Sequence, residues 1–444
     1  MNVPHDLPAQ YATHRRLVSI KWLVPMVVIP IAGFAVYVGW LLFSEYRAHQ
    51  SMNARMTSVG AASSAPTDAW LAKRFAETAS REGTAAWSEI TALSSSVGWS
   101  AINDLPIIGN GKSLRTLEVG VQWQQHELVD QYLKEARPLL ELIYQAEKYP
   151  TPVWQPIDFR GFNTMLPELQ ESRQIARILQ LDFEQAIIGS DPVRAMRDLQ
   201  AMQNTADAFD WDLFIVGELV NMALRSMRYS AIQRSLFANV WTEADLERLI
   251  EHAQRPLPLA QSWRRSLESE KALGMNFMQS PLYSPHTRLL YLERFTQLEA
   301  LAESPAGQFA IRYRELDAQL TDKQADPFIP TMLQPAFESY AAAFDRLERS
   351  RRLVLTSLAV KLFQLKHARW PENLQELEQV GLRSGDWTLP AIGPLGYAVQ
   401  ADGQTACVWG VPDGKSLQDG VAQNCPDHSG EKLEKVGYYV TVIK

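Results

Sequence analysis

The chain has 444 residues, of which 46% are hydrophobic, so it carries enough apolar material for a sizeable core. Its formal net charge is −7 and its acidic and basic residues are interspersed, which argues against a nucleic-acid-binding surface. The two cysteines, Cys407 and Cys425, do not have CxxC spacing, which argues against a zinc ribbon and a thioredoxin-type redox site.

The strongest signal near the N-terminus is the uncharged run over residues 22–43, WLVPMVVIPIAGFAVYVGWLLF. As a helix these 22 residues are about 33 Å long, enough to cross the hydrocarbon core of a bilayer. The run is longer than the apolar region of a cleaved signal peptide, and no small-residue cleavage site follows it. It therefore predicts a retained transmembrane helix.

The charges around this run predict its orientation. Arg15, Arg16 and Lys21 precede it closely, whereas the basic residues that follow are sparser and partly offset by Glu45. The positive-inside bias places residues 1–21 in the cytoplasm and the chain beyond residue 43 outside it. An oxidising compartment then favours a disulfide between the two cysteines, and two free thiols are the alternative.

Residues 44–66 are rich in Ser, Ala and Gly without an apolar period, which predicts a stalk. Residues 67–369 then show helical periodicity for most of their length, which predicts an extracytoplasmic helical domain. The predicted helical segments are 67–83, 84–98, 126–150, 166–191, 193–209, 212–237, 242–254, 283–322 and 335–369.

Short turns between these segments predict an antiparallel array that is solenoid-like, although no fixed repeat period recurs. Asp191 and Pro192 form a capping signature at one such turn, and Thr242 is a capping residue at another. The predicted fold is therefore mainly α, with an N-terminal transmembrane helix, the helical array, and a small C-terminal α+β region.

Residues 370–444 form that α+β region. Trp370-Pro371 ends the long helix, and alternating apolar residues flank the turn at Asp402-Gly403, which predicts a hairpin. The segment VGYYVTVIK predicts a further strand. Asp413 and Asp419 lie on glycine-containing turns, where calcium ligation is an alternative to a plain turn.

The chain lacks the local motifs of catalysis. It contains no HExxH, GxSxG, P-loop or GxGxxG motif, and its one SxxK, Ser429 to Lys432, lies in a polar loop. No two histidines have i, i+4 spacing on a helix, so we predict neither a metal site nor a cofactor. We therefore favour a non-enzymatic role and leave an enzymatic role open.

The candidate ligand-binding residues are Glu218, Asn221 and Arg225. Their i, i+3, i+7 spacing places them on one face of a predicted apolar helix. They form either a ligand clamp or acid/base pair in a groove, or an ion-paired strip at a helix seam. The dispersed tryptophans likewise either line a binding groove or act as wedges between helices.

The C-terminal segments LAVKLFQLKHARWPENLQELEQVGL and GPLGYAVQADGQTACVWGVPDG resemble the C-terminal pattern of the major pseudopilins of type II secretion. The matching residues are Gly393, Pro394, Leu395, Tyr397, Gly410, Asp413 and Gly414. The predicted anchor lies far upstream of this pattern and no prepilin-processing motif precedes it. The resemblance therefore does not imply assembly into a pseudopilus.

Residues 85–415 also resemble a group of uncharacterised bacterial envelope proteins that have one N-terminal span, a helical array and this same tail. The resemblance implies a single-pass protein of the bacterial inner membrane, with its N-terminus inside and most of the chain extracytoplasmic. The expected partners are the bilayer, through residues 22–43, and proteins of the envelope, but not nucleic acid.

The leading hypothesis is a membrane-anchored scaffold or binding subunit of an envelope complex. One alternative is an envelope hydrolase that uses carboxylates from separate helices, since such pairs leave no local motif. A second alternative is an accessory protein of secretion or pilus assembly.

Overall fold

The chain divides into two units, Met1–Ser63 with Tyr283–Leu289 and Ser64–Leu282 with Leu290–Lys444. The computed structural model describes residues 36–44, 46–47, 50, 68–96, 102–114, 116–166, 168–210, 213–278, 280, 283, 285–305, 307–321, 333–389, 393–410 and 439–444.

The N-terminal predictions fall mostly outside the described residues. Residues 36–44 are helical, whereas residues 1–35 and most of the predicted stalk are not described. In the described part of the chain, no helix is long and apolar enough to cross a bilayer. The anchor, its orientation and the stalk stay predictions.

The second unit is mainly helical and ends in a small strand-containing part, as the sequence predicts. Its helices are α2 (Asp68–Thr78), α3 (Thr84–Ser96), η1 (Ile102–Asp104), α4 (His126–Ala146), α5 (Glu168–Ile188), α6 (Pro192–Ala208), α7 (Ile215–Ser235), α8 (Glu243–Gln254), α9 (Leu259–Phe277), η2 (Ala300–Glu303), α11 (Phe309–Thr321), α13 (Gln334–His367), η3 (Leu374–Val380) and η4 (Ser384–Asp386). A further helix, α10 (Pro285–Glu299), begins in the first unit and continues in the second.

Two predicted helix starts are confirmed. Asp191 precedes α6, its carboxylate accepts the Arg194 N–H at 3.0 Å, and Pro192 is the first helical residue. This joins α5 and α6 in a hairpin whose helices pack along each other. Thr242 and Asp245 form a reciprocal capping box that begins α8.

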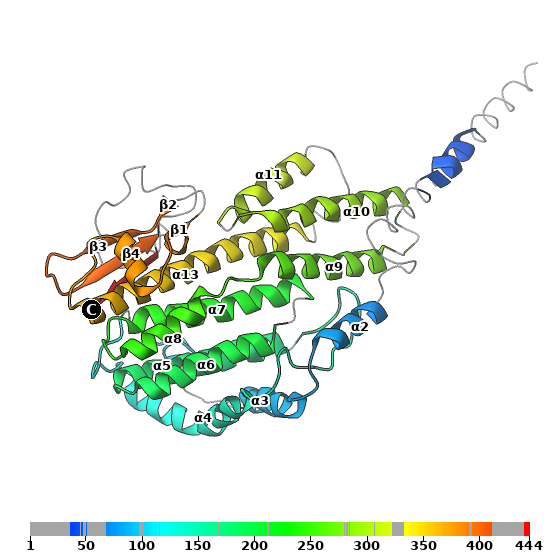
Figure 1. Ribbon diagram of the computed structural model, residues 1–444. Helices are drawn as coiled ribbons and strands as arrows, with labels where there is room; N and C mark the ends of the chain where they lie inside the picture. Colours follow the sequence, from blue (N-terminus) through cyan, green and yellow to red (C-terminus); the bar gives the residue numbers. More distant parts are fainter. Residues whose placement is uncertain are drawn as a thin grey trace, which may run out of the picture. The chain divides into compact units, whose positions relative to one another are not determined.

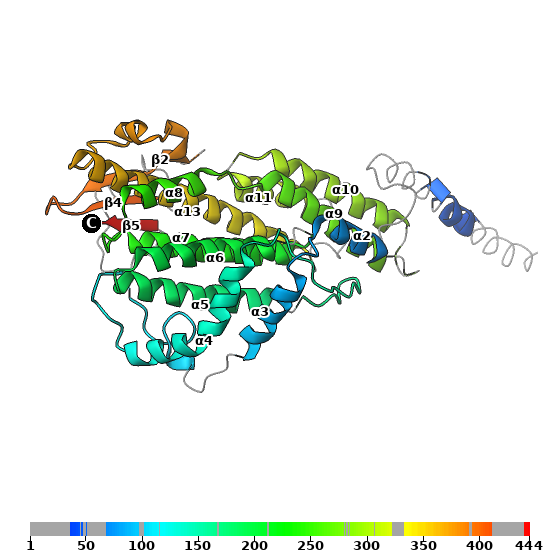
Figure 2. The same cartoon turned by 60° about the horizontal axis from the view of Figure 1, so that its bottom comes forward.

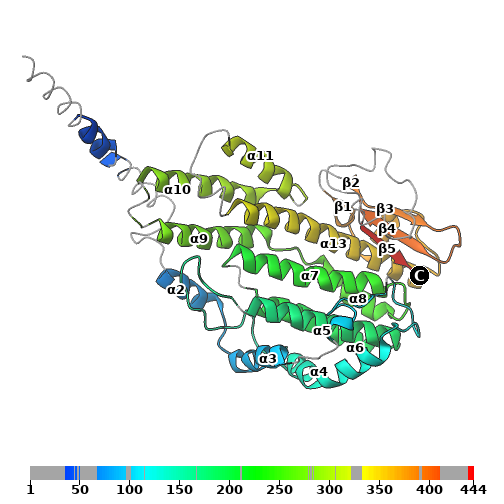
Figure 3. The same cartoon turned by 180° about the vertical axis from the view of Figure 1, so that it is seen from behind.

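The helix α13 lies at the centre of the second unit. It packs along α7, α8 and α11, and Figures 1 and 3 show it beside α7 from both sides. On the other side of α7 lie α5 and α6, with α3 and α4 beyond them (Figure 2). Because α13 follows α8 late in the chain yet packs on it, the array is not a solenoid in which each unit touches only its sequence neighbours.

The core contains clusters of aromatic side chains from different helices. Trp263 of α9 is fully buried, and its ring lies 5.0 Å from Phe309 and 4.9 Å from Tyr340, measured between centroids. Its Nε1–H donates to the Leu298 carbonyl at 2.8 Å, which satisfies the buried indole. Core packing is confirmed for the tryptophans buried here, namely Trp87, Trp123, Trp241, Trp263, Trp387 and Trp409.

The strands of the C-terminal part are β1 (Thr388–Leu389), β2 (Gly393–Pro394), β3 (Gly396–Val399), β4 (Ala406–Gly410) and β5 (Tyr439–Ile443). The predicted hairpin is confirmed as β3 and β4, and β5 pairs antiparallel with β4. Asp402 stabilises the turn by accepting the N–H groups of Gln404 and Thr405 at 2.9 and 3.1 Å. Both β4 and β5 pack on α13.

The helix α13 ends at the predicted tryptophan-proline step, although Pro371 does not begin the next helix. Ala368 takes a left-handed conformation with φ +53°, and Asn373 caps η3 by accepting the Gln375 N–H at 3.1 Å. Trp370 Nε1–H donates to the Gly403 carbonyl at 3.1 Å. The indole therefore contacts the hairpin turn rather than only the helix junction.

Two predictions about the tail cannot be placed in this fold. Cys407 is buried on β4, whereas Cys425 lies outside the described residues, so the disulfide stays a prediction. Asp413 and Asp419 also lie outside the described residues.

Candidate functional site

The three candidate residues on α7 lie together at one small cavity. Glu218, Asn221 and Arg225 line it from α7, with Asp210 from the segment after α6 and Tyr340 from α13. Glu218 and Asn221 are buried because this face of α7 packs against other helices rather than against solvent. The sequence spacing therefore identified residues that share a surface.

Hydrogen bonds tie these residues to α6. Arg225 Nε donates to Asn221 Oδ1 at 2.6 Å, and Asn221 Nδ2 donates to the Ala206 carbonyl at 2.7 Å. Arg225 Nη2 donates to Asp207 Oδ1 at 2.9 Å and to Asp210 Oδ2 at 3.3 Å. Arg225 thus joins α7 to the C-terminal end of α6.

The charge of Arg225 is stabilised where it lies. Burial alone would lower the pKa of its guanidinium, but the carboxylates of Asp207 and Asp210 more than offset this, so the pKa is raised. Its side chain is 17% exposed, so these ion pairs are partly shielded from solvent. Arg225 is therefore a permanent cation with its carboxylate partners already in place.

The size of the cavity limits what this arrangement can do. About 20 Å³ is open to a water molecule, which is room for roughly one water. A ligand on Arg225 would have to displace Asp207, Asp210 or Asn221 from it. The geometry matches the ion-paired strip at a helix seam better than a ligand clamp, and ligand binding here stays a prediction.

A second charged cluster, which the sequence reading missed, joins α4, α5 and α6. The hydroxyl of Tyr144 lies 2.5 Å from Asp198 Oδ1 and 3.1 Å from Asp182 Oδ2. Arg194 donates to both oxygens of Asp182, from Nε at 3.0 Å and from Nη2. Neither carboxylate has exposed surface.

Of the two carboxylates in this cluster, Asp182 forms the ion pair with Arg194. Burial and the neighbouring charge of Asp182 raise the pKa of Asp198 well above its ordinary value, although the contact with Tyr144 opposes this. Two like charges this close are costly to ionise together, which favours the protonated form of Asp198. The available sequence signal was Asp182, one of two acidic residues within the largely apolar run ILQLDFEQAII.

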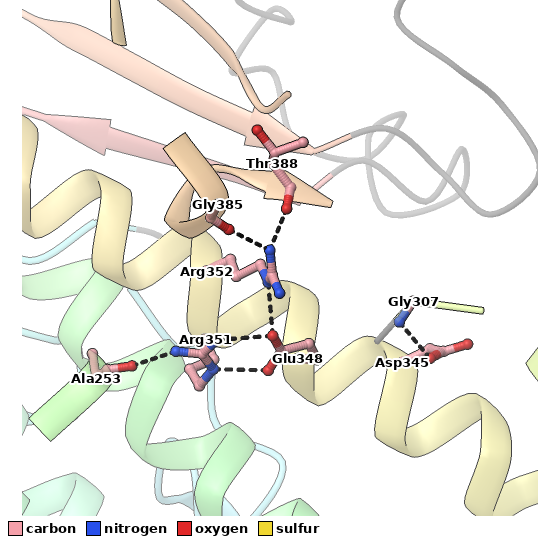
Figure 4. A network of polar contacts seen from close by, with 8 residues as sticks. All are labelled: Ala253, Gly307, Asp345, Glu348, Arg351, Arg352, Gly385 and Thr388. Atoms are coloured by element: carbon pink, nitrogen blue, oxygen red, sulfur yellow. Dashed lines mark hydrogen bonds and ion pairs between the residues drawn. The ribbon is translucent and has the colours of Figure 1, made fainter. Parts of the chain in front are cut away.

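A third network centres on Glu348 of α13 (Figure 4). Its carboxylate accepts hydrogen bonds from Arg351 and from Arg352 Nε, the latter at 2.7 Å. Arg351 Nη1 also donates to the Ala253 carbonyl at 2.6 Å, and Arg352 Nη1 donates to the Gly385 carbonyl at 2.6 Å. Burial would raise the pKa of Glu348, but the two arginines outweigh it and lower that pKa.

Within the residues that the structure describes, no group of three or more His, Cys, Asp or Glu side chains is arranged to hold a metal ion. The chain matches no protein-family model, no curated protein and no solved structure.

Proposed function

We propose that this chain is a non-enzymatic scaffold or binding subunit of a bacterial envelope complex, anchored in the inner membrane by residues 22–43. The observation that carries the proposal is that the carboxylates of Asp182 and Asp198 connect helices to one another. These carboxylates come from separate helices, have no exposed surface, and contact Tyr144 and Arg194. They connect α4, α5 and α6 through hydrogen bonds and present no carboxylate surface to solvent.

A hydrolase with carboxylates from separate helices is the rival function. It needs two carboxyl groups about 5–10 Å apart on either side of a space that admits a substrate. Glu218 and Asp210 do line one cavity, but the space there accommodates roughly one water. This argues against a hydrolase site at Glu218 and Asp210.

The resemblance of the tail to pseudopilins supports a narrower version of the proposal, an accessory protein of secretion or pilus assembly. The order of elements in the tail fits that pattern: a long helix, the Trp370-Pro371 step, the short helix η3 and the hairpin β3–β4. The predicted position of the anchor still separates this chain from a pilus subunit.

The proposal is tested by isolating the chain from native membranes through a tag at its N-terminus. In mild detergent, native mass spectrometry should find it with a protein partner at fixed stoichiometry, and a tagged unrelated single-span protein is the control. Recovery of the chain without a partner would count against the scaffold. Hydrolysis of envelope glycan or peptide that is lost in Glu218→Gln would establish the rival.

The predicted location is tested separately. A fusion of alkaline phosphatase after residue 66 should be active, since the enzyme needs an oxidising compartment, and a fusion after residue 21 should be inactive. In SDS, a maleimide should label Cys407 and Cys425 only after reduction. Labelling without reductant would disprove the disulfide.

A further inference from the structure

A larger cavity lies between α6, α7, α8 and the end of α4. Its volume is about 380 Å³, within the range of small-molecule sites in proteins. Met196, Leu199 and Leu249 give it an apolar wall. Its charged lining consists of Glu147, Arg197, Arg228, Asp245, Arg248 and His252.

Arg228 is the unusual member of this lining. It is only 4% exposed, and its Nε donates to the Leu199 carbonyl at 3.1 Å. Among the described residues, no carboxylate lies within ion-pair distance of Arg228, and its Nη atoms donate to no protein group. By contrast, the part-buried Arg225 and the buried Arg351 each pair with a carboxylate.

Burying an arginine without a counter-charge costs free energy, and here the cost lowers the pKa of Arg228. An anion bound in the cavity would offset that cost. A guanidinium offers parallel N–H donors, which a carboxylate accepts in pairs. Arg228 is therefore placed to hold an anion at the inner end of the cavity.

The other charged side chains that line the cavity indicate which type of anion it would bind. Arg197 is already paired with Glu141 at 3.4 Å, and Asp245 accepts hydrogen bonds from Thr242. Arg248 makes no ion pair among the described residues and lies on the exposed side of α8. Of the three arginines in this lining, only Arg228 is both buried and without an ion pair among the described residues, so the cavity offers one buried cation, which suits a monoanion.

We propose that this cavity binds a small organic carboxylate, with the carboxylate on Arg228 and a short apolar body against Met196, Leu199 and Leu249. The positive charge of Arg248, on the exposed side of α8, attracts the carboxylate to the entrance of the cavity. The proposal goes beyond the scaffold function, because it assigns a ligand that the purified chain binds without any protein partner.

The first test compares three probes on the purified full chain in detergent by thermal unfolding. Hexanoate at millimolar concentration should raise the Tm by several degrees, whereas hexanol should not, because it lacks the charge. Inorganic phosphate should have a smaller effect, because it lacks the apolar body. Equal shifts with hexanoate and hexanol, or with hexanoate and phosphate, would overturn the assigned ligand class.

The second test locates the binding. Arg248→Gln should weaken hexanoate binding about fivefold or more, measured by calorimetry, because it removes the cation at the entrance. Arg255→Gln is the matched control: it removes the same charge from the end of the same helix, outside the cavity, and should bind as wild type. Equal affinity of the wild type and Arg248→Gln would place the binding elsewhere.

Arg228→Met tests the inner end of the cavity with a side chain of similar length. It should abolish hexanoate binding. Without ligand it should unfold at the same urea concentration as wild type or higher, because an unpaired buried charge has been removed. Hexanoate binding that survives in this variant would disprove the role of Arg228.

Discussion

The carboxylate of Glu348 accepts two hydrogen bonds from the guanidinium of Arg351, at 2.7 and 2.8 Å, on the buried face of α13 (Figure 4). Arg351 donates a hydrogen bond to the Ala253 carbonyl at the end of α8. The neighbouring Arg352 donates one to the Gly385 carbonyl in the C-terminal part. One carboxylate thus fixes two arginines that join α13 to separate parts of the chain.

Glu348→Ala should strongly destabilise the protein. It leaves the buried charge of Arg351 and the part-buried charge of Arg352 without their carboxylate. Removing one partner of a buried ion pair costs about 3–5 kcal/mol. Urea unfolding at pH 7 measures the change. Glu338→Ala removes an exposed carboxylate from the same helix and should change the stability by less than about 0.5 kcal/mol. Equal effects of the two substitutions would show that the network contributes little.

Asp182 and Asp198 should respond differently to replacement by asparagine. Burial and the neighbouring Asp182 raise the pKa of Asp198 and so favour its protonated form, for which asparagine is a close substitute. Asp198→Asn should therefore change the free energy of unfolding by less than about 1 kcal/mol. Asp182→Asn leaves Arg194 without its carboxylate and should cost about 3 kcal/mol. Urea unfolding at pH 7 compares the two variants. A larger loss in Asp198→Asn would mean that Asp198 is the ionised partner.

Glu270→Gln should remove part of the pH dependence of stability. Glu270 on α9 is buried and accepts the Ile215 N–H at 3.2 Å; burial raises its pKa from 4.5 to about 7, although that hydrogen bond opposes the shift. Between these values the folded protein keeps a proton that the unfolded chain has lost. Stability therefore falls as the pH rises through this window, by on the order of 3 kcal/mol in total.

Glutamine still accepts the Ile215 N–H but does not ionise. Urea unfolding from pH 5 to pH 8 should thus show a smaller loss in Glu270→Gln than in wild type, with the variant the more stable at pH 8. Glu315→Gln, on the exposed side of α11, should follow the wild-type curve. Parallel curves for Glu270→Gln and wild type would contradict a raised pKa at Glu270.

Ala368→Gly should stabilise the end of α13. Ala368 has φ +53°, a left-handed conformation that costs a residue with a Cβ about 1–2 kcal/mol and glycine almost nothing. After allowing for the greater freedom of glycine in the unfolded chain, we expect a gain of about 0.5–1 kcal/mol in urea unfolding. The same substitution at Ala318, exposed in α11, should cost about 1 kcal/mol. A loss at both positions would refute the explanation.

Features encoded by neighbouring residues were predictable from the sequence. The start of α6 follows from Asp191 and Pro192, and the turn between β3 and β4 follows from Asp402 and Gly403, because each motif satisfies its own backbone groups. The shared face of Glu218, Asn221 and Arg225 follows from helical spacing alone.

Features that depend on how distant segments align were not predictable. Nothing in the sequence near Arg225 shows that Asp207 and Asp210 become its partners, because that depends on how far α7 slides along α6. The same holds for Asp182 and Asp198, which meet only once α5 and α6 are in register. The packing of α13 on α7 and α8 is likewise a property of the whole chain.

The packing of α13 on α7 and α8 also determines when this part of the fold can form during synthesis. A ribosome releases α7 and α8 well before it has made α13, whose apolar face covers them in the native protein. Until residues 334–367 emerge, that surface has no native cover, and contacts between distant segments form slowly. We therefore expect this helical unit to complete its fold only after α13 has been made, and nascent chains stopped before α13 to be the ones that bind chaperones.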